Sequence, residues 1–266
     1  MITAKPLKDQ SSLADLKRQY LAQTTGPLDG MWLCGFVPMA SHYALMHGDD
    51  LAGFYCVNDD GYLLQVAIDH RFQADASTIF ESGLAGGDGA VKGAFASTAE
   101  PLYFSMCLDR FAQFKVNALM YEHNGETTSL PEPLGLRLVN ESQLEQAVAH
   151  CVTSMGGPRE WLVGYLGGLI AKKELFGAWQ NGELIATGES RGSHEHQPGY
   201  VDVGVVVAPS QRGRGMATRV LQALVARNLE LDLRSICSTE KGNKAAQKAI
   251  RRAGFRSRNR IVQFDA

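Results

Sequence analysis

A glycine-rich turn between an apolar run and an amphipathic run constrains this chain more than any other feature. Residues 201–207 are mostly valine. The turn Arg212-Gly213-Arg214-Gly215-Met216-Ala217 comes a few residues later, and a helical pattern over residues 218–229 begins directly after it. Two glycines allow the backbone to approach a ligand closely, and the first amides of a helix have no partner within it. Together with the two arginines, the turn predicts a site for a phosphate-like anion.

Other phosphate-binding loops fit this turn less well. A Walker-type loop ends in Gly-Lys-Ser/Thr, and a dinucleotide fingerprint places Gly-x-Gly-x-x-Gly early in a βαβ unit with an acidic residue about twenty positions later. Neither pattern is present around Gly213 and Gly215. The remaining alternative is an ordinary strand-to-helix turn with two solvated arginines.

The turn resembles the Arg/Gln-x-x-Gly-x-Gly/Ala signature of the GNAT superfamily of acyl-CoA-dependent N-acyltransferases. Arg212, Gly215 and Ala217 occupy its fixed positions, and the flanks agree, with a central strand before the turn and Gly254-Phe255 near the end. The resemblance covers the C-terminal half. It implies that the loop binds the CoA pyrophosphate, that the central strand's backbone binds the thioester, and that an asparagine contacts pantetheine. The cofactor-binding residues it implies are Val205, Val206, Val207, Arg212, Gly213, Arg214, Gly215, Met216, Ala217 and Asn243.

A polar segment with glycine and proline near the middle of the chain predicts two domains. The polar stretch 123–133 holds Gly125 and two prolines, so we expect an N-terminal α+β domain at 1–125, a linker at 126–134 and a GNAT domain at 135–266. The expected fold class is α/β (α+β), with a mixed, mostly antiparallel central sheet flanked by helices. In the second domain the patterns predict, in order, a strand at 136–139, helices at 141–152 and 158–172, a hairpin at 174–180 and 183–191, the central strand, the loop and its helix, a strand at 235–239, and a helix at 244–252.

The N-terminal half has weaker signals. Residues 51–57 and 62–68 flank an Asp-Gly turn and predict a hairpin, followed by a helix at 75–84 and a strand at 115–121. This order loosely repeats the second half, which suggests a degenerate GNAT-like domain without a phosphate loop. The glycines of 83–89 follow a helix and carry an acid, so we interpret them as a flexible connection.

Acyl transfer to an amine requires a base, because an alkyl amine with a pKa near 10.4 is mostly protonated at neutral pH. Asp202 on the central strand and Glu189 on the preceding strand are the candidates. For each, the alternative is a solvated or salt-bridged carboxylate. His194 and His196 have a suitable pKa, but they lie in a polar loop and lack a third metal partner, so no metal site is expected.

A general acid is harder to find. Many GNAT relatives place a tyrosine four residues before the Gly of the closing Gly-Phe pair, and this position is Ile250 here. Water or the hydroxyls of Ser238, Thr239 or Tyr200 are the alternatives as proton donor.

The charge balance and the cysteine content of the chain bear on its binding partners and its location. Lys and Arg number 26 against 28 Asp and Glu, which gives no electrostatic case for nucleic acid or an anionic membrane surface. The 5 cysteines are scattered without a Cys-x-x-Cys pair, as is typical of reduced thiols in a cytoplasmic protein. No apolar stretch is long enough to span a bilayer. The predicted location is therefore cytoplasmic.

The leading hypothesis is transfer of acetyl from acetyl-CoA, as co-substrate, to a primary amine of a small molecule or peptide by direct attack. The alternative is a non-catalytic acyl-CoA-binding or sensor protein, which Ile250 would suit, and a third is transfer of a longer acyl group. The near-neutral charge disfavours a polyamine acceptor. The acceptor and the oligomeric state, including a homodimer, stay open.

Overall fold

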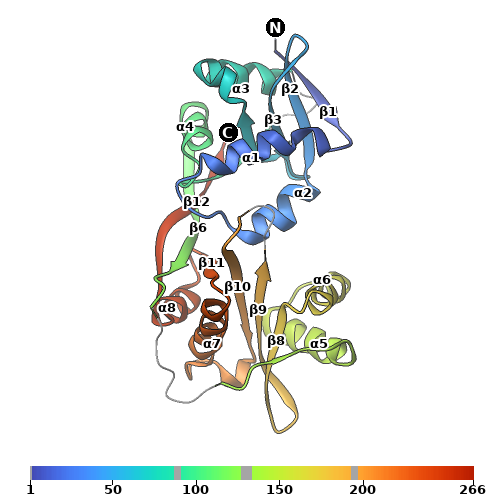
Figure 1. The fold of residues 1–266 in the computed structure, drawn as a ribbon, viewed down its shortest axis with the longest axis vertical. Coiled ribbons are helices and arrows are strands. Elements are labelled where there is room, and N and C mark those ends of the chain that lie inside the picture. The colour runs from blue at the N-terminus through green and yellow to red at the C-terminus, as the bar shows by residue number, and fades with distance from the viewer. Residues whose placement is uncertain (1, 87–90, 127–133, 193–196) are drawn as a thin grey trace. The chain divides into compact units, whose positions relative to one another are not determined.

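A computed structural model of the chain describes residues 2–86, 91–126, 134–192 and 197–266. The chain forms two compact units (Figure 1). Unit 1 comprises residues 1–120 and 259–266, and unit 2 comprises Tyr121–Arg258. Each contains a mixed, mostly antiparallel sheet flanked by helices, which confirms the expected fold class. Within the described residues, no helix combines the length and the apolar character that crossing a membrane requires.

Unit 1 orders its strands β1-β2-β3-β4-β5-β12, where β12 contributes residues from the end of the chain. Neighbours are antiparallel except β4 and β5, which are parallel. Its elements are β1 (Ile2–Leu7), α1 (Ala14–Ala22), a π-helical turn (Trp32–Phe36), α2 (Val37–Met39), β2 (Ser41–His47), β3 (Asp50–Val57), β4 (Tyr62–Ile68), α3 (Ala76–Ala85), β5 (Gly93–Ser97), α4 (Pro101–Arg110) and β6 (Gln113–His123), with short 3-10 turns at Ser11–Leu13 and His70–Asp75.

Helices cover both faces of the unit 1 sheet. One core cluster packs α3 and α4 against the sheet, and another packs Leu13, Leu16 and Tyr20 around α1 against the opposite face. The predicted hairpin, helix and strand are present as β3, β4, α3 and β6, whereas β1, α1, β2, β5 and α4 were not predicted. Helix α3 runs to Ala85 and includes Gly83, where a Cβ would lie 2.2 Å from Leu45 Cδ2. This part of the predicted flexible connection is therefore helix, and residues 87–89 lie outside the described residues.

Unit 2 orders its strands β6-β11-β10-β9-β8-β7, with β6 contributing its last residues. Only β10 and β11 are parallel among the pairs whose register is described. Its elements are β7 (Arg137–Leu138), α5 (Leu144–Met155), α6 (Arg159–Ala171), β8 (Leu175–Gln180), β9 (Glu183–Gly192), β10 (Tyr200–Val207), α7 (Met216–Glu230), β11 (Arg234–Glu240), α8 (Lys244–Arg252) and β12 (Phe255–Asp265), with 3-10 turns at Glu141–Gln143 and Pro209–Gln211.

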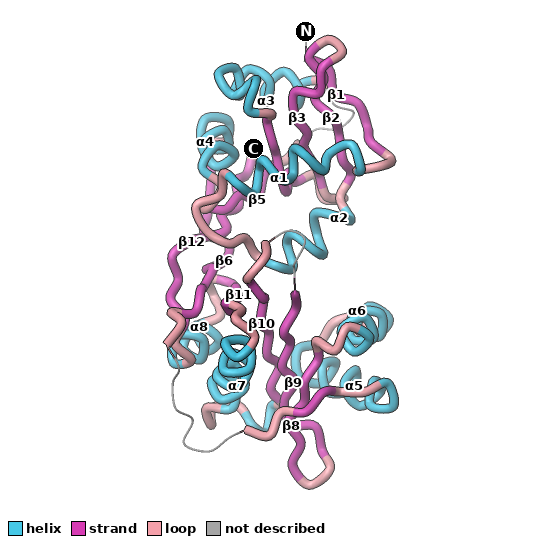
Figure 2. Tube along the Cα trace, viewed as in Figure 1, coloured by secondary structure: helices cyan, strands magenta, loops and turns pink. Residues whose placement is uncertain are grey.

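Different helices pack on the two faces of the unit 2 sheet. Helices α5 and α6 lie on one side of β8–β10 and α7 lies on the other (Figure 2). On the α7 face, Ser190 Oγ donates to Asn228 Oδ1 at 3.0 Å. The element order matches the prediction, and the Asn181-Gly182 turn has the positive φ angles of 52° and 83° that were expected.

The last strand joins the units along the chain. Residues 259–266 belong to unit 1, where Ile261–Asp265 pair with β5 and Phe264 is fully buried beside Phe104 and Phe111. The chain also enters unit 2 within β6, before the expected boundary at 125, and 127–133 of the expected linker lie outside the described residues. The observed units differ from the predicted boundaries because β6 and β12 each continue unbroken from one unit into the other.

Candidate active site

The turn from β10 into α7 is open and rich in backbone donors. Gly213 and Gly215 have φ angles of 74° and 81°, and Gly215 is the N-cap of α7 with no side chain capping it. A Cβ at either glycine would meet nothing within 4 Å, so their positive φ, and not crowding, favours glycine. The first-turn amides around Met216 and Ala217 and the positive end of the helix dipole are suited to hold an anion.

The two arginines of the turn differ in placement. Arg212 donates from Nε to the Val207 carbonyl oxygen at 3.3 Å and from Nη2 to the Ser154 carbonyl oxygen. Its guanidinium therefore connects the end of β10 to the end of α5, instead of facing the helix N-terminus. Arg214 is exposed between the two glycines, which makes it the side chain of this turn best placed to meet a phosphate.

Strands β10 and β11 separate after a short parallel ladder. The ladder pairs Tyr200, Val201 and Asp202 with residues 234–236, although β10 continues to Val207 and β11 to Glu240. On its other edge β10 pairs with β9 along its length from Val201. The gap between β10 and β11 thus begins just beyond Asp202.

The register shows which backbone groups of β10 face this gap. The amide of Ala208 donates to the Ile185 carbonyl oxygen at 3.0 Å, so residues of even number in β10 make the hydrogen bonds to β9. The N–H groups of Val205 and Val207 consequently point away from β9, toward the gap. The predicted residues Val205, Val206 and Val207 lie here and are half-buried. Two N–H donors where the strands have separated suit the carbonyl oxygen of a thioester.

A polar cluster on the α5/α6 face brings both predicted carboxylates together. Glu189 and Arg191 on β9 lie opposite Gly204 and Asp202 on β10. Arg191 contacts Glu189 Oε2, and its Nη2 lies 3.1 Å from Asp202 Oδ2. Tyr165 of α6 donates to Glu189 Oε2 at 2.6 Å and accepts from Arg191 Nη1 at 2.6 Å.

Burial makes this cluster strongly coupled. Glu189 is 7% exposed and Asp202 is 2% exposed. Burial alone would lower the pKa of Arg191, but the two carboxylates outweigh it and hold that pKa well above its usual value. Burial and the charge of Glu189 raise the pKa of Tyr165. Arg191 is therefore a cation and Tyr165 a neutral hydroxyl.

Glu189 is the better placed base of the two. Tyr165 and Arg191 both contact its Oε2, and among the described residues its Oε1 receives no hydrogen bond. A Cβ at Gly204 would lie 3.1 Å from Glu189 Oε2, so the glycine leaves room for this carboxylate above the central strand. Asp202 lies deeper and is oriented by Arg191.

The other predicted residues lie around the gap. Ile250 is 5% exposed on α8, so no hydroxyl comes from that position. Ser238 and Thr239 are half-buried in the part of β11 beyond the ladder, and Tyr200 begins β10. Asn243 is the N-cap of α8, where its Oδ1 accepts from the Ala246 amide at 3.0 Å. Its amide nitrogen remains the group suited to pantetheine.

His194 and His196 lie outside the described residues. Among the residues that the structure does describe, no group of three or more His, Cys, Asp or Glu is placed to bind a metal ion.

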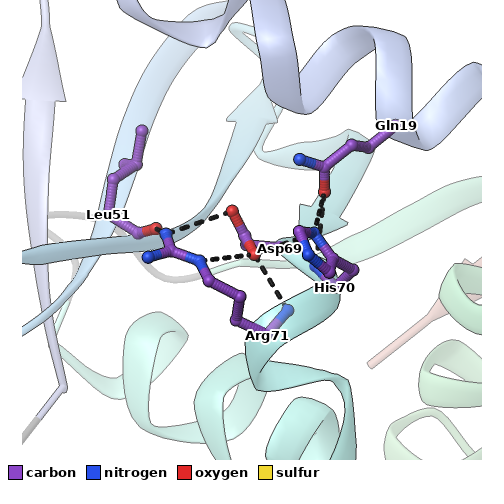
Figure 3. A network of polar contacts seen from close by, with 5 residues as sticks. All are labelled: Gln19, Leu51, Asp69, His70 and Arg71. Atoms are coloured by element: carbon purple, nitrogen blue, oxygen red, sulfur yellow. Dashed lines mark hydrogen bonds and ion pairs between the residues drawn. The ribbon is translucent and has the colours of Figure 1, made fainter.

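Unit 1 repeats the short parallel ladder, but a carboxylate caps the turn after its β4 strand. Its parallel ladder between β4 and β5 is also short, pairing Tyr62 with Gly93 and Leu63 with Ala94. Asp69 directly follows β4. Its carboxylate accepts hydrogen bonds from the backbone amide of Arg71 at 2.9 Å and from the guanidinium of Arg71 at 3.0 and 3.2 Å (Figure 3). The hydrogen bond from the Arg71 side chain is the main cause that lowers the pKa of Asp69. A carboxylate of the chain itself therefore caps the 3-10 turn that follows β4.

The gap of unit 1 is also closed. Tyr20 of α1 contacts the carboxylate of Glu100, the N-cap of α4 and the counterpart of Asn243. The two cavities beside Glu100 measure about 20 Å³ and about 10 Å³, which is room for roughly one water each.

Sequence reasoning missed Arg191 and Tyr165. The alternation Glu189-x-Arg191 in a strand places both side chains on one face, and this was the available signal for Arg191. Tyr165 had no comparable signal, because its contact depends on how α6 lies over the sheet.

Comparisons with known proteins agree with this geometry. A model described as an acetyltransferase (GNAT) domain matches residues 9–124, and one described as the acetyltransferase (GNAT) family matches residues 148–255. A solved acetyltransferase of the GNAT family from Colwellia psychrerythraea is 46% identical over 98% of each chain, with a TM-score of 0.94. A tandem GNAT protein from the clavulanic acid biosynthesis pathway, 12% identical over 100% of this chain and 98% of its own, shares the fold with a TM-score of 0.61. No curated protein matches.

The resemblance seen in the C-terminal half therefore extends to the N-terminal half. This chain belongs to the GNAT family of acetyltransferases and carries two GNAT domains.

Proposed function

We propose that unit 2 binds acetyl-CoA and transfers its acetyl group to a primary amine of a small molecule or peptide. The observation that carries the proposal is the gap between β10 and β11, next to an uncapped helix N-terminus with two left-handed glycines. The amides at Gly213–Ala217 and Arg214 would bind the pyrophosphate. Pantetheine would enter the gap past Asn243.

The groups beside the gap suit direct attack. The N–H groups of Val205 and Val207 would bind the thioester oxygen as negative charge develops on it. Glu189, directly or through a water, would take a proton from the amine, whose nitrogen bonds to the acetyl carbon as the carbon–sulfur bond breaks. The departing CoA thiolate takes a proton from water or from Ser238, Thr239 or Tyr200.

A titration tests the cofactor assignment. We expect one acetyl-CoA to bind per chain, in unit 2, because residues 69–76 between β4 and α3 of unit 1 contain no glycine and the cavities beside Glu100 have room for roughly one water each. Arg214→Glu reverses a charge at the phosphate site and should weaken binding at least tenfold, since a hydrogen bond to a charged group contributes about 1.5–3 kcal/mol. Isothermal titration calorimetry measures both the affinity and the stoichiometry.

Lys172→Glu is the matched control for this titration. It makes the same charge change at an exposed residue at the end of α6, and it should bind acetyl-CoA as the wild type does. Absence of binding to the wild type would contradict the acetyl-CoA assignment, and two sites per chain would contradict a closed unit 1.

A second experiment tests the base. Glu189→Gln should retain acetyl-CoA binding and lower kcat about 100-fold, the low end of what a general base contributes. The readout is CoA thiol release with a panel of primary amines. Full activity in this variant would exclude Glu189 as the base.

The non-catalytic alternative rests on a specific observation. Ile250 removes the family's hydroxyl from α8, and Arg191 engages both carboxylates. A protein that binds acetyl-CoA but releases no thiol with any amine of the panel would be a sensor or binding protein.

A further inference from the structure

A pocket of about 230 Å³ lies in unit 2, away from the β10–α7 turn. It is formed where β6 ends and where β11 and β12 begin, and its lining includes Glu122, Arg234, Arg256 and Arg258. One bound water requires roughly 10–15 Å³ of such space. The pocket is therefore large enough for a ligand of several atoms.

The charges that line this pocket are mostly positive. Glu122 is its acidic residue, and its Oε1 lies 3.7 Å from Arg234 Nη1, a loose ion pair. Arg256 and Arg258 are exposed and two residues apart on β12, so they project from the same face of that strand. Neither pairs with a carboxylate among the residues that the structure describes. Three guanidinium groups and one carboxylate give a net charge of two positive units.

The pocket is separate from the proposed pyrophosphate site. Leu229, which lines it, lies near the C-terminal end of α7, whereas Gly215 caps the N-terminal end. At 1.5 Å per residue these two ends are about 21 Å apart. The C-terminal end of a helix carries partial negative charge, so an anion here would be bound by the arginines and not by the helix.

We propose that this pocket binds a small dianion, either a phosphate monoester or a dicarboxylate. The guanidinium fork presents paired N–H donors that match the oxygens of both groups. A dianion would neutralise the two excess positive charges. The site is independent of acetyl-CoA binding and of acetyl transfer.

The test uses the full chain carrying Arg214→Glu, which weakens binding of the probe at the β10–α7 turn. Inorganic phosphate and succinate are titrated separately by calorimetry in a buffer without other dianions. The pocket variant carries Arg256→Gln and Arg258→Gln, and the control carries Arg251→Gln and Arg252→Gln, exposed arginines in α8. Both pairs remove the same charge from exposed positions.

We expect saturable binding of phosphate or succinate with a Kd in the millimolar range or below. The pocket pair should weaken it at least tenfold, and the control pair should change it less than twofold. Binding of phosphate alone identifies a phosphate monoester as the ligand class, and binding of succinate alone identifies a dicarboxylate. Absence of saturable binding of either probe, or equal weakening by the two arginine pairs, would overturn the proposal. In the Arg214 background, acetyl-CoA binding to unit 2 has no influence on these outcomes.

Discussion

Replacing Arg191 with methionine is expected to lower the free energy of unfolding of unit 2 by roughly 3–5 kcal/mol at pH 7. The guanidinium contacts Glu189 and Asp202, two carboxylates that are almost fully buried. Methionine has a similar length and no charge, so the variant removes the guanidinium that lies between two buried carboxylates. Breaking a buried pair by removing one member is costly for this reason.

The loss should become smaller as the pH falls. Without Arg191, protonation of a buried carboxylate removes a charge that the protein interior disfavours. A carboxyl with a raised folded pKa stabilises the folded state more at low pH, where it takes a proton. The variant should therefore recover part of its stability at pH 5. Urea denaturation followed by tryptophan fluorescence measures this, since Trp161 stacks on Tyr165 beside the cluster.

Arg159→Met provides the control for this experiment. Arg159 pairs with Glu145 at the surface, and both side chains are exposed. An exposed ion pair contributes about 0–1 kcal/mol, so this variant should unfold close to the wild type. An Arg191→Met protein that is as stable as Arg159→Met would show that the cluster does not hold buried charges.

The turn from β10 into α7 could be predicted from the sequence because its requirements are local. Positive φ at Gly213 and Gly215, and a helix that begins after them, depend on a few adjacent residues. The Asn181-Gly182 hairpin is of the same kind. The separation of β10 from β11 could be inferred only through the family resemblance, because no local pattern shows where a parallel ladder ends.

The cluster of Tyr165, Glu189, Arg191 and Asp202 depends on long-range geometry. Asp202 and Arg191 meet because β9 and β10 pair in a particular register, and a shift of one residue would turn one of them to the other face. The sequence allowed a salt-bridged carboxylate at both acidic positions but did not identify the cation. Strand β12 is a similar case, because no local pattern shows that its residues 259–265 belong to unit 1.

Glu100 is expected to make unit 1 less stable as the pH rises from 5 to 9. Burial raises the pKa of this carboxyl to about 8 in the folded state, and the Ser97 amide opposes that shift by donating to it. In the unfolded chain the pKa is near 4.5. Between these values the folded state binds the proton more tightly, so stability is highest below pH 4.5 and declines until about pH 8.

The size of this decline follows from the shift. About 3.5 pKa units at 1.36 kcal/mol each correspond to roughly 5 kcal/mol as an upper value. Glu100→Gln should remove most of it, because glutamine has no charge to bury and can still accept from the Ser97 amide. Urea denaturation at pH 5, 7 and 9 measures the slope, with Trp161→Phe and Trp179→Phe leaving Trp32 as the fluorescent reporter of unit 1.

The variant Tyr20→Phe distinguishes the effect of the Glu100 charge from the effect of the hydrogen bond between Tyr20 and Glu100. The Tyr20 hydroxyl contacts this carboxylate, and its loss should raise the pKa of Glu100 further and keep the pH dependence, because the carboxyl stays in place. Glu100→Gln should abolish the dependence even with Tyr20 present. Parallel pH curves for the wild type and Glu100→Gln would show that Glu100 is not the titrating group, and that the gap of unit 1 is hydrated enough to hold a charged carboxylate.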